Sequence, residues 1–204
     1  LRNCGEHRAK LNNRQLCIEF SKAAHALEGV HFLIELRHAA ENVGHRVLLD
    51  ECVGPHRLRQ ELAQLKVIDL SARNEAVPDA YIVYRLTDDE SLGFFLEIDR
   101  GRMRGDSFKK KAEGYRSWYA APSSWRQFGR IIDSMGHRRF PPVMVMTTTE
   151  QHMRYLMAQI DAAGTGQVRW YLSNWQRLRE APGGILGAIW QKVPTGSYSL
   201  LDLA

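Results

Sequence analysis

The sequence predicts an α/β fold in which helices flank both faces of a mixed central sheet. Two observations support this prediction. Residues 80–98 read as an antiparallel hairpin, because two apolar runs, AYIVYRL and LGFFLEI, flank the polar turn TDDES. The strand-like runs near residues 145 and 170 are linked through a helix, which is the connection that parallel strands require.

The segment before the hairpin contains five predicted elements. Apolar residues at helical spacing predict a helix over 14–28 that stops at Gly29, and a second helix over 31–43 that stops at Gly44. They are followed by a strand over 45–53, a short helix over 55–65 and a short strand over 66–70. We expect residues 1–30 to form an N-terminal helical extension and residues 31–204 to form one domain.

The segment after the hairpin alternates between helices and strands. We predict helices over 106–121, 123–136 and 149–164, with Thr149 as the cap of the last one. Strands are predicted within 141–149 and 167–175, and the C-terminal stretch 183–204 reads as a hairpin or a pair of short strands.

The composition indicates a cytoplasmic protein. No apolar run reaches the length of a membrane span, and the N-terminal residues lack the hydrophobic core of a secretory signal. Cys4, Cys17 and Cys52 are odd in number and form no CxxC motif, so we expect reduced thiols and no zinc site. We expect no membrane partner.

Basic residues are concentrated in one segment. Residues 100–139 contain 11 Lys and Arg against 3 acids, a local charge of +8, whereas the rest of the chain has 17 against 20. Such an asymmetry is typical of a surface that binds a polyanion. It predicts a DNA-binding surface, for which the candidate residues are Arg100, Arg102, Arg104, Lys109, Lys111, Arg138 and Arg139.

Three carboxylates stand at the open end of the hairpin. If Leu86 and Leu92 are the last paired residues, Asp79 faces Asp99 and Tyr81 faces Glu97. These four residues are odd-numbered and therefore share one face of the sheet. The opposite face is apolar and consists of the even-numbered residues Ile82, Leu86, Phe94, Leu96 and Ile98. We therefore expect Asp79, Glu97 and Asp99 to converge.

Such a cluster requires a cation, because neighbouring carboxylates disfavour each other's ionisation. One alternative is Mg²⁺ or Mn²⁺ held by Asp79, Glu97 and Asp99, since oxygen ligands suit a hard divalent ion. The other is neutralisation by Arg100, Arg102, Arg104 or Lys111, without a metal. Lys111 is well placed because it lies beside the apolar stripe of the following helix and can reach back over the sheet edge.

The residues PD at 78–79, an acid at Glu97 and a following lysine resemble the motif of the PD-(D/E)xK nuclease superfamily. The resemblance implies a restriction-endonuclease-like core over 31–204, with Asp79 and Glu97 as metal ligands and Glu35 as an additional acid on the preceding helix. Asp99 occupies the position two residues after the Glu where the superfamily usually has its lysine. The resemblance then assigns the catalytic lysine to Lys111, alongside Asp79 and Glu97.

A narrower resemblance covers roughly residues 30–195. The stretches RNEAVPDAYIVYR, FFLEIDRG, KAEGYRSWY and VMVMTTTE resemble the replication-relaxation family of plasmids and integrative elements. Its usual small polar and acidic residues after DRG are replaced here by Arg102 and Met103. This resemblance implies a DNA-binding protein of a mobile genetic element, with a relaxase or other replication proteins as partners.

Three functions remain open from the sequence. The first is a DNA-binding accessory protein that acts in plasmid replication or in the relaxosome-type processing of conjugation. The second is an active Mg²⁺-dependent endonuclease, and the third is a protein-interaction domain whose acids pair with its own arginines. The basic segment argues against the third function, and the absence of a lysine two residues after Glu97 favours the first over the second. Trp118, Tyr119 and Trp125 are either core residues or platforms for unpaired bases.

Overall fold

A computed structural model describes residues 13–64, 76–103, 106–121, 140–164, 167–193, 197–198 and 200 of the chain. In it the strands form a seven-stranded sheet whose spatial order follows the chain order. The strands are β1 (Arg46–Val47), β2 (Ala80–Arg85), β3 (Ser91–Asp99), β4 (Val143–Thr147), β5 (Trp170–Asn174), β6 (Trp190–Val193) and β7 (Ser197–Tyr198). β3, β4 and β5 are parallel and the other neighbours are antiparallel, so the predicted mixed sheet is confirmed.

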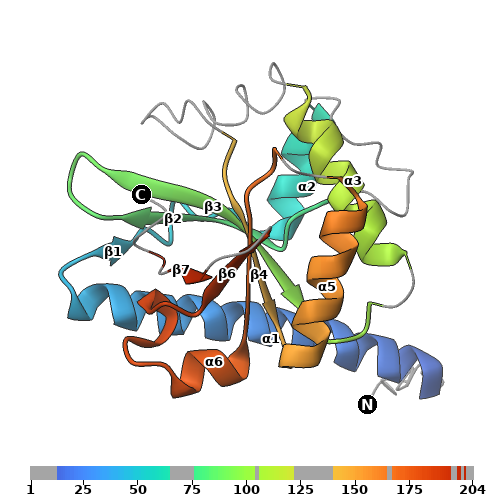
Figure 1. The fold of residues 1–204 in the computed structure, drawn as a ribbon, viewed down its shortest axis with the longest axis horizontal. Helices are drawn as coiled ribbons and strands as arrows, with labels where there is room; N and C mark the ends of the chain where they lie inside the picture. Colours follow the sequence, from blue (N-terminus) through green and yellow to red (C-terminus); the bar gives the residue numbers. More distant parts are fainter. Residues whose placement is uncertain are drawn as a thin grey trace, which may run out of the picture.

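Helices cover both faces of this sheet (Figure 1). They are α1 (Asn13–Asn42), α2 (Pro55–Gln64), α3 (Ser107–Tyr119), α5 (Glu150–Ala162) and α6 (Trp175–Glu180), followed by the short 3-10 helix η1 (Gly184–Leu186). α1 and α6 lie on one face, and α2, α3 and α5 lie on the other.

Each face of the sheet has its own apolar core, because successive strand residues point to opposite sides. Tyr81, Val83 and Phe95 pack against α2, α3 and α5. Ile82 and Phe94 belong to the core under α1 and α6. The even-numbered face of the hairpin is therefore apolar as predicted, but the odd-numbered face is buried as well. Glu97 and Asp99 are consequently buried rather than on an open surface.

The hairpin register differs from the predicted one by two residues. The last strand pair is Arg85 with Ser91, not Leu86 with Leu92. The reason is the turn, in which the Leu86 amide donates to the Glu90 carbonyl at 2.9 Å. Leu86 therefore lies opposite Glu90 instead of Leu92. A shift of two residues keeps every side chain on its predicted face.

The N-terminal region forms one continuous helix instead of the two that were predicted. α1 runs from Asn13 to Asn42, so the predicted stop at Gly29 is wrong, and a domain boundary at residue 30 falls inside this helix. Phe32, Leu36 and Ala40 are fully buried and continue the packed face beyond the glycine. This packing outweighs the cost of about 1 kcal/mol that a glycine imposes within a helix. Within the described residues, no helix has the length and apolar character needed to cross a membrane.

The remaining predicted elements divide into three groups. The helices now seen as α2, α3 and α5 are confirmed, and Thr149 caps α5 by accepting a hydrogen bond from the His152 amide at 3.2 Å. The predicted strand over 45–53 is shorter, consisting of β1 and an isolated bridge between Val53 and Tyr81. The predicted strand over 66–70 and helix over 123–136 lie outside the described residues. α6 was not predicted.

A close approach between α3 and the segment before β2 allows a direct test of this packing. A Cβ at Gly114 would lie 2.8 Å from the Ala76 Cβ, whereas a Cβ at Gly29, in the middle of α1, would meet nothing within 4 Å. We expect Gly114→Ala to lower the free energy of unfolding by about 1–3 kcal/mol through overpacking. The matched change Gly29→Ala should raise it by about 0.5–1 kcal/mol. Chemical denaturation of both variants checks this, and equal effects would contradict the described packing.

Candidate functional site

The centre of the site is Glu97, near the end of β3, which is only 2% exposed. Lys111 and Tyr115, one turn apart on α3, both reach it. The Lys111 ammonium donates to Oε2, and the Tyr115 hydroxyl donates to Oε1 at 2.6 Å. Lys111 therefore reaches back over the sheet as the helix geometry predicted.

Burial dominates the ionisation of this cluster. It raises the pKa of Glu97 to about 7, because the charge of Lys111 offsets only part of the lost hydration and the charge of Asp79 adds to the shift. Burial disfavours the charged form of Lys111, but the negative charges of Glu97 and Asp79 outweigh it and raise the pKa of the ammonium group. The pKa of Tyr115 lies well above its usual value because of burial and the adjacent Glu97.

Asp79 lies beside Glu97 at the start of β2. In the observed register Ala80 pairs with Leu96, and the Asp79 amide donates to the Leu96 carbonyl at 2.9 Å. The predicted pairing of Asp79 with Asp99 is therefore wrong, and Asp79 comes next to Glu97 instead. Its carboxylate accepts from the Ile98 amide at 2.8 Å and lies 3.0 Å from His25 Nε2.

The contact with His25 changes the pKa of both partners. Burial opposes ionisation of Asp79, but the hydrogen bond with His25 and the charge of Lys111 outweigh it, so the pKa of Asp79 is lowered. The same hydrogen bond raises the pKa of His25 against the opposing effect of burial. Asp79 is therefore a stable carboxylate, whereas its neighbour Glu97 holds a proton up to about neutral pH.

Asp99, the last residue of β3, is bound to α5. Its Oδ2 lies 2.6 Å from His152 Nε2, and its Oδ1 accepts from the Gly101 amide at 3.1 Å. Gly101 has a φ of 72°, and a Cβ there would lie 2.9 Å from Thr148 Oγ1. The DRG stretch thus requires glycine at its third position, because the chain reverses there directly against the loop before α5.

α1 is tied to the same strand end through a second ion pair. Arg100, which follows Asp99, donates to Glu28 at 2.9 Å. Glu35, predicted as an additional acid, is not brought to the cluster. It lies ten residues after His25 on the same helix, roughly 15 Å further along its axis, and pairs with His31 at 3.3 Å.

The predicted DNA-binding residues have different surroundings. Arg102 is exposed and Lys109 is half-buried. Arg100 and Lys111 are paired with carboxylates of the same chain. Arg104, Arg138 and Arg139 lie outside the described residues.

The predicted aromatic platforms are only partly described. Trp118 is 2% exposed and belongs to the core, and Tyr119 packs against that core. Trp125 is not described. Stacking of bases on Trp118 is therefore not available in this structure.

The carboxylates do not form a complete metal centre by themselves. In the part of the chain that is described, no group of three or more His, Cys, Asp or Glu side chains could hold a metal ion. Asp79 and Glu97 are the two adjacent carboxylates, and their oxygens are of the kind that Mg²⁺ or Mn²⁺ takes when water and phosphate complete its shell. Asp99 is instead engaged by His152.

His25 and His152 were missed by sequence reasoning. His25 comes from a helix far away in the sequence, and no local pattern marks it. A signal for His152 did exist, because it lies in the first turn of the helix after a strand that is parallel to β3. Side chains in that position lie over the carboxyl ends of neighbouring strands, where α/β proteins bind ligands.

A pocket of about 760 Å³ opens beside the cluster. α1, the loop before α2, and the strands β2 and β3 contribute to its lining, which includes Asp79 and Asp99. Comparison of the chain with protein-family models, curated proteins and solved structures finds no match. The function must therefore be argued from this geometry and the sequence.

The raised pKa of Glu97 predicts a pH-dependent stability. The unfolded chain loses this proton near pH 4.5 and the folded chain near pH 7, so the folded state binds more protons between these values. The free energy of unfolding should therefore fall as pH rises through this window. Relative to the double variant Glu97→Gln/Lys111→Met, the wild type should lose on the order of 2–3 kcal/mol between pH 5 and pH 8.

Denaturant unfolding of both proteins in the presence of EDTA measures this difference. The double variant keeps the Tyr115 hydrogen bond through the Gln carbonyl and removes both charges of the pair. A difference between the two proteins that stays constant from pH 5 to pH 8 would show that Glu97 ionises normally.

Proposed function

We propose that this chain is a DNA-binding accessory protein of a mobile genetic element, built on a restriction-endonuclease-like core. It acts in the cytoplasm, in plasmid replication or in the relaxosome-type processing of conjugation. Its partners are DNA and a relaxase or other replication proteins. One observation carries this choice over a nuclease. Asp79, Glu97 and Asp99 each have a basic partner within the chain, namely His25, Lys111 and His152.

The internal pairing makes the cluster stable without a divalent ion. Removal of one partner from a buried pair leaves an uncompensated charge, which is strongly destabilising. Here each carboxylate is joined to a helix, so the cluster holds β3 to α1, α3 and α5. These contacts give the carboxylates a structural role that does not depend on catalysis.

Contact with DNA is assigned to the basic segment 100–139. Arg102 is exposed directly after the carboxylate cluster, and Lys110 is exposed on α3. This segment has a charge of +8, whereas the remaining residues sum to −3. The positive charge is therefore concentrated in one place, which favours a single polyanion-binding surface over an evenly basic protein.

A second candidate, the active Mg²⁺-dependent endonuclease, is favoured by the arrangement of Asp79, Glu97 and Lys111. Asp79 is held beside Glu97, and the Lys111 ammonium contacts Glu97. Asp79 and Glu97 would hold Mg²⁺ or Mn²⁺, which supplies Lewis-acid chemistry when bound. Lys111 would position water or balance charge on the phosphate, and Tyr115 would orient Glu97.

Charge reversal tests the proposed DNA surface. The variant with Arg102, Arg104, Arg138 and Arg139 changed to Glu should bind DNA more weakly and with a flatter salt dependence. Each lost phosphate contact should lower the slope of log K against log salt by about 0.9, because fewer counterions are released. Fluorescence anisotropy with a labelled duplex between 50 and 300 mM salt measures the slope.

The matched control reverses four exposed arginines outside this segment, namely Arg37, Arg59, Arg154 and Arg179. It changes the net charge by the same amount and should leave the slope close to that of the wild type. Equal slopes for the two variants would mean that 100–139 is not the contact surface.

Incubation with supercoiled plasmid separates the two candidate functions. For an accessory protein we expect binding without nicking in EDTA, Mg²⁺ or Mn²⁺. For a nuclease, nicking should require a divalent ion and be lost in Asp79→Asn/Glu97→Gln, which keeps the shapes of both side chains, while DNA binding remains. Agarose electrophoresis gives both readings, and nicking that persists in the double variant would exclude these carboxylates as its source.

A further inference from the structure

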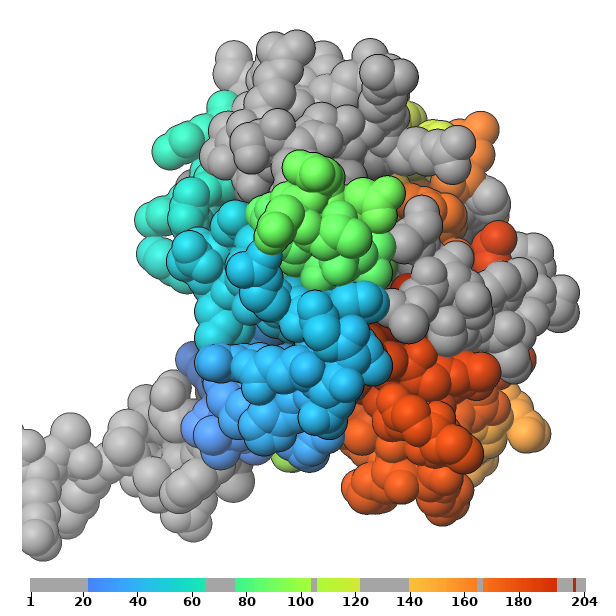
Figure 2. Space-filling model, turned by 90° about the vertical axis from the view of Figure 1, so that its left-hand side faces the viewer, coloured from blue at the N-terminus to red at the C-terminus, as the bar shows by residue number. Residues whose placement is uncertain are grey.

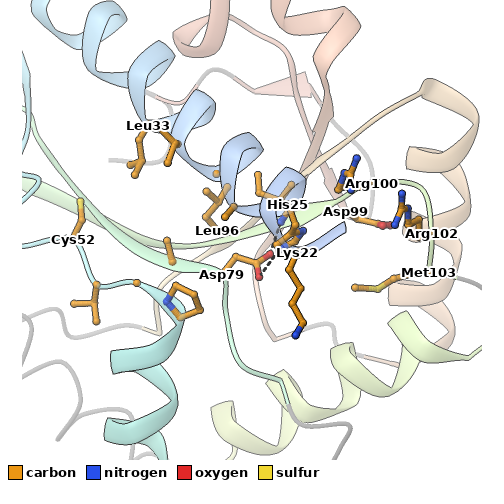
Figure 3. Close-up of a pocket in the computed structure, with 18 of the residues that line it drawn as sticks. Lys22, His25, Leu33, Cys52, Asp79, Leu96, Asp99, Arg100, Arg102 and Met103 are labelled. Carbon is orange, nitrogen blue, oxygen red and sulfur yellow. Dashed lines mark hydrogen bonds and ion pairs between the residues drawn. The ribbon is translucent and has the colours of Figure 1, made fainter. Parts of the chain in front are cut away.

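The pocket beside the cluster has two chemically different parts (Figure 3). Leu33, Cys52 and Leu96 lie toward one side. Val30 and Val53 also belong to the apolar lining of the pocket. Lys22, His25 and Asp79 lie near the middle, and Asp99, Arg100 and Arg102 lie toward the other side. A ligand of this pocket therefore needs an apolar body with a charged end.

The pocket is large enough to hold a small-molecule ring system. Its volume, about 760 Å³ for the whole pocket, falls in the range of small-molecule sites, which is about 300–1,000 Å³. Gly29 lies on the α1 wall, and nothing stands within 4 Å of the position that its Cβ would occupy. The space next to this helix is thus open to a ligand, with a half-buried thiol, Cys52, across it.

The charged part suits an anion. Lys22, Arg100 and Arg102 are basic residues that line this end, and Arg100 is held in place by Glu28. Asp79 and Asp99, also in the lining, are engaged by His25 and His152. The charge of Arg100 is offset by Glu28, but Lys22, Arg102 and His25, whose pKa is raised by its hydrogen bond with Asp79, outnumber Asp79 and Asp99. An anionic group is therefore favoured at this end.

We propose that this pocket binds one unpaired nucleotide of a DNA strand, with its base in the apolar part and its phosphate at Lys22, Arg100 and Arg102. This proposal rests on the proposed DNA-binding function and specifies the form of the substrate. A base within a duplex is covered by its stacking neighbours, so only an unpaired or flipped nucleotide can insert.

Figure 2 views the molecule from the side of the hairpin tip, where the segment after α1 (light blue) lies between the hairpin (green) and the C-terminal elements (orange to red). α1 and the segment from β1 to α2 both contribute to the pocket lining, through Val30 and Leu33 on the helix and Leu49 and Cys52 after it. The pocket is therefore built from several elements that the sheet holds together, not from one helix face.

Cys52 provides a direct probe. In a Cys4→Ser/Cys17→Ser background, it is the only thiol in the sequence. Saturating oligo-dT of eight nucleotides should slow its alkylation by N-ethylmaleimide at least about fivefold, because the inserted base covers the sulfur. A relaxed, covalently closed circular duplex, which has neither a free end nor an unpaired loop, should bind without slowing alkylation. Sodium laurate serves as a second probe, since it has an apolar body and an anionic end but no base.

A pocket-filling substitution tests the same point through affinity. Gly29→Leu places a side chain in the pocket from α1 without a clash at Cβ. It should weaken binding of oligo-dT about tenfold, because the leucine side chain occupies space that the base would fill. The control Gly29→Ala adds only a methyl group and should change binding less than about twofold. The affinity for the closed duplex should be the same in all three proteins.

The outcomes separate this proposal from the proposed function. If the closed duplex binds but oligo-dT neither protects Cys52 nor responds to Gly29→Leu, the pocket is not a nucleotide site and the DNA-binding function stands. If neither DNA binds, the proposed function fails as well. Protection by laurate and not by oligo-dT would overturn the nucleotide assignment in favour of another amphipathic anion.

Discussion

The contact of Lys111 and Tyr115 with the buried carboxylate of Glu97 fixes how α3 sits on the sheet. Both donors are needed, because a charge in the interior is tolerated only when it is paired and hydrogen-bonded. The two residues are four apart and therefore lie on the same side of the helix. Turning that side toward Glu97 also directs Phe108 and Ala112 into the core. The polar contact and the apolar packing thus require the same rotation of the helix.

The end of β3 joins both layers of the protein. Glu97 binds α3, Asp99 binds α5 through His152, and Arg100 binds α1 through Glu28. Asp79, from the neighbouring strand, adds a second link to α1. A ligand that displaced any of these partners would therefore act on a whole helix as well as on one side chain. If the pocket binds a nucleotide as proposed, this coupling would connect the bound phosphate with the position of α1.

Local sequence patterns were sufficient to predict most helices and strands, but they did not predict the long-range contacts. Helical spacing located α2, α3 and α5, because a single buried face dictates that pattern. The hairpin, whose strands are buried on both faces, was located by its two apolar runs around a polar turn. The stop expected at Gly29 failed because tertiary packing outweighed the weak preference of one glycine. Within the site, the convergence of Asp79 and Glu97 followed from strand parity, and the reach of Lys111 followed from helix rotation. His25 could not be found, since its contact with Asp79 spans two elements whose relative position no local pattern encodes.

The strands lie in the sheet in the same order as in the chain, and this order affects how the protein can fold during synthesis. During synthesis, each strand after the first leaves the ribosome when its preceding neighbour in the sheet is already available. Each of these strands can therefore begin to pair at once, without waiting for a strand that is encoded later. α1 is made before all of them and supplies an apolar surface for Phe94 and Ile82 as soon as the hairpin closes. The chain can therefore assemble vectorially, by adding one strand at a time to a growing edge. Once β3 has emerged from the ribosome, the hairpin can therefore pack against α1 before His152, the partner of Asp99, has emerged.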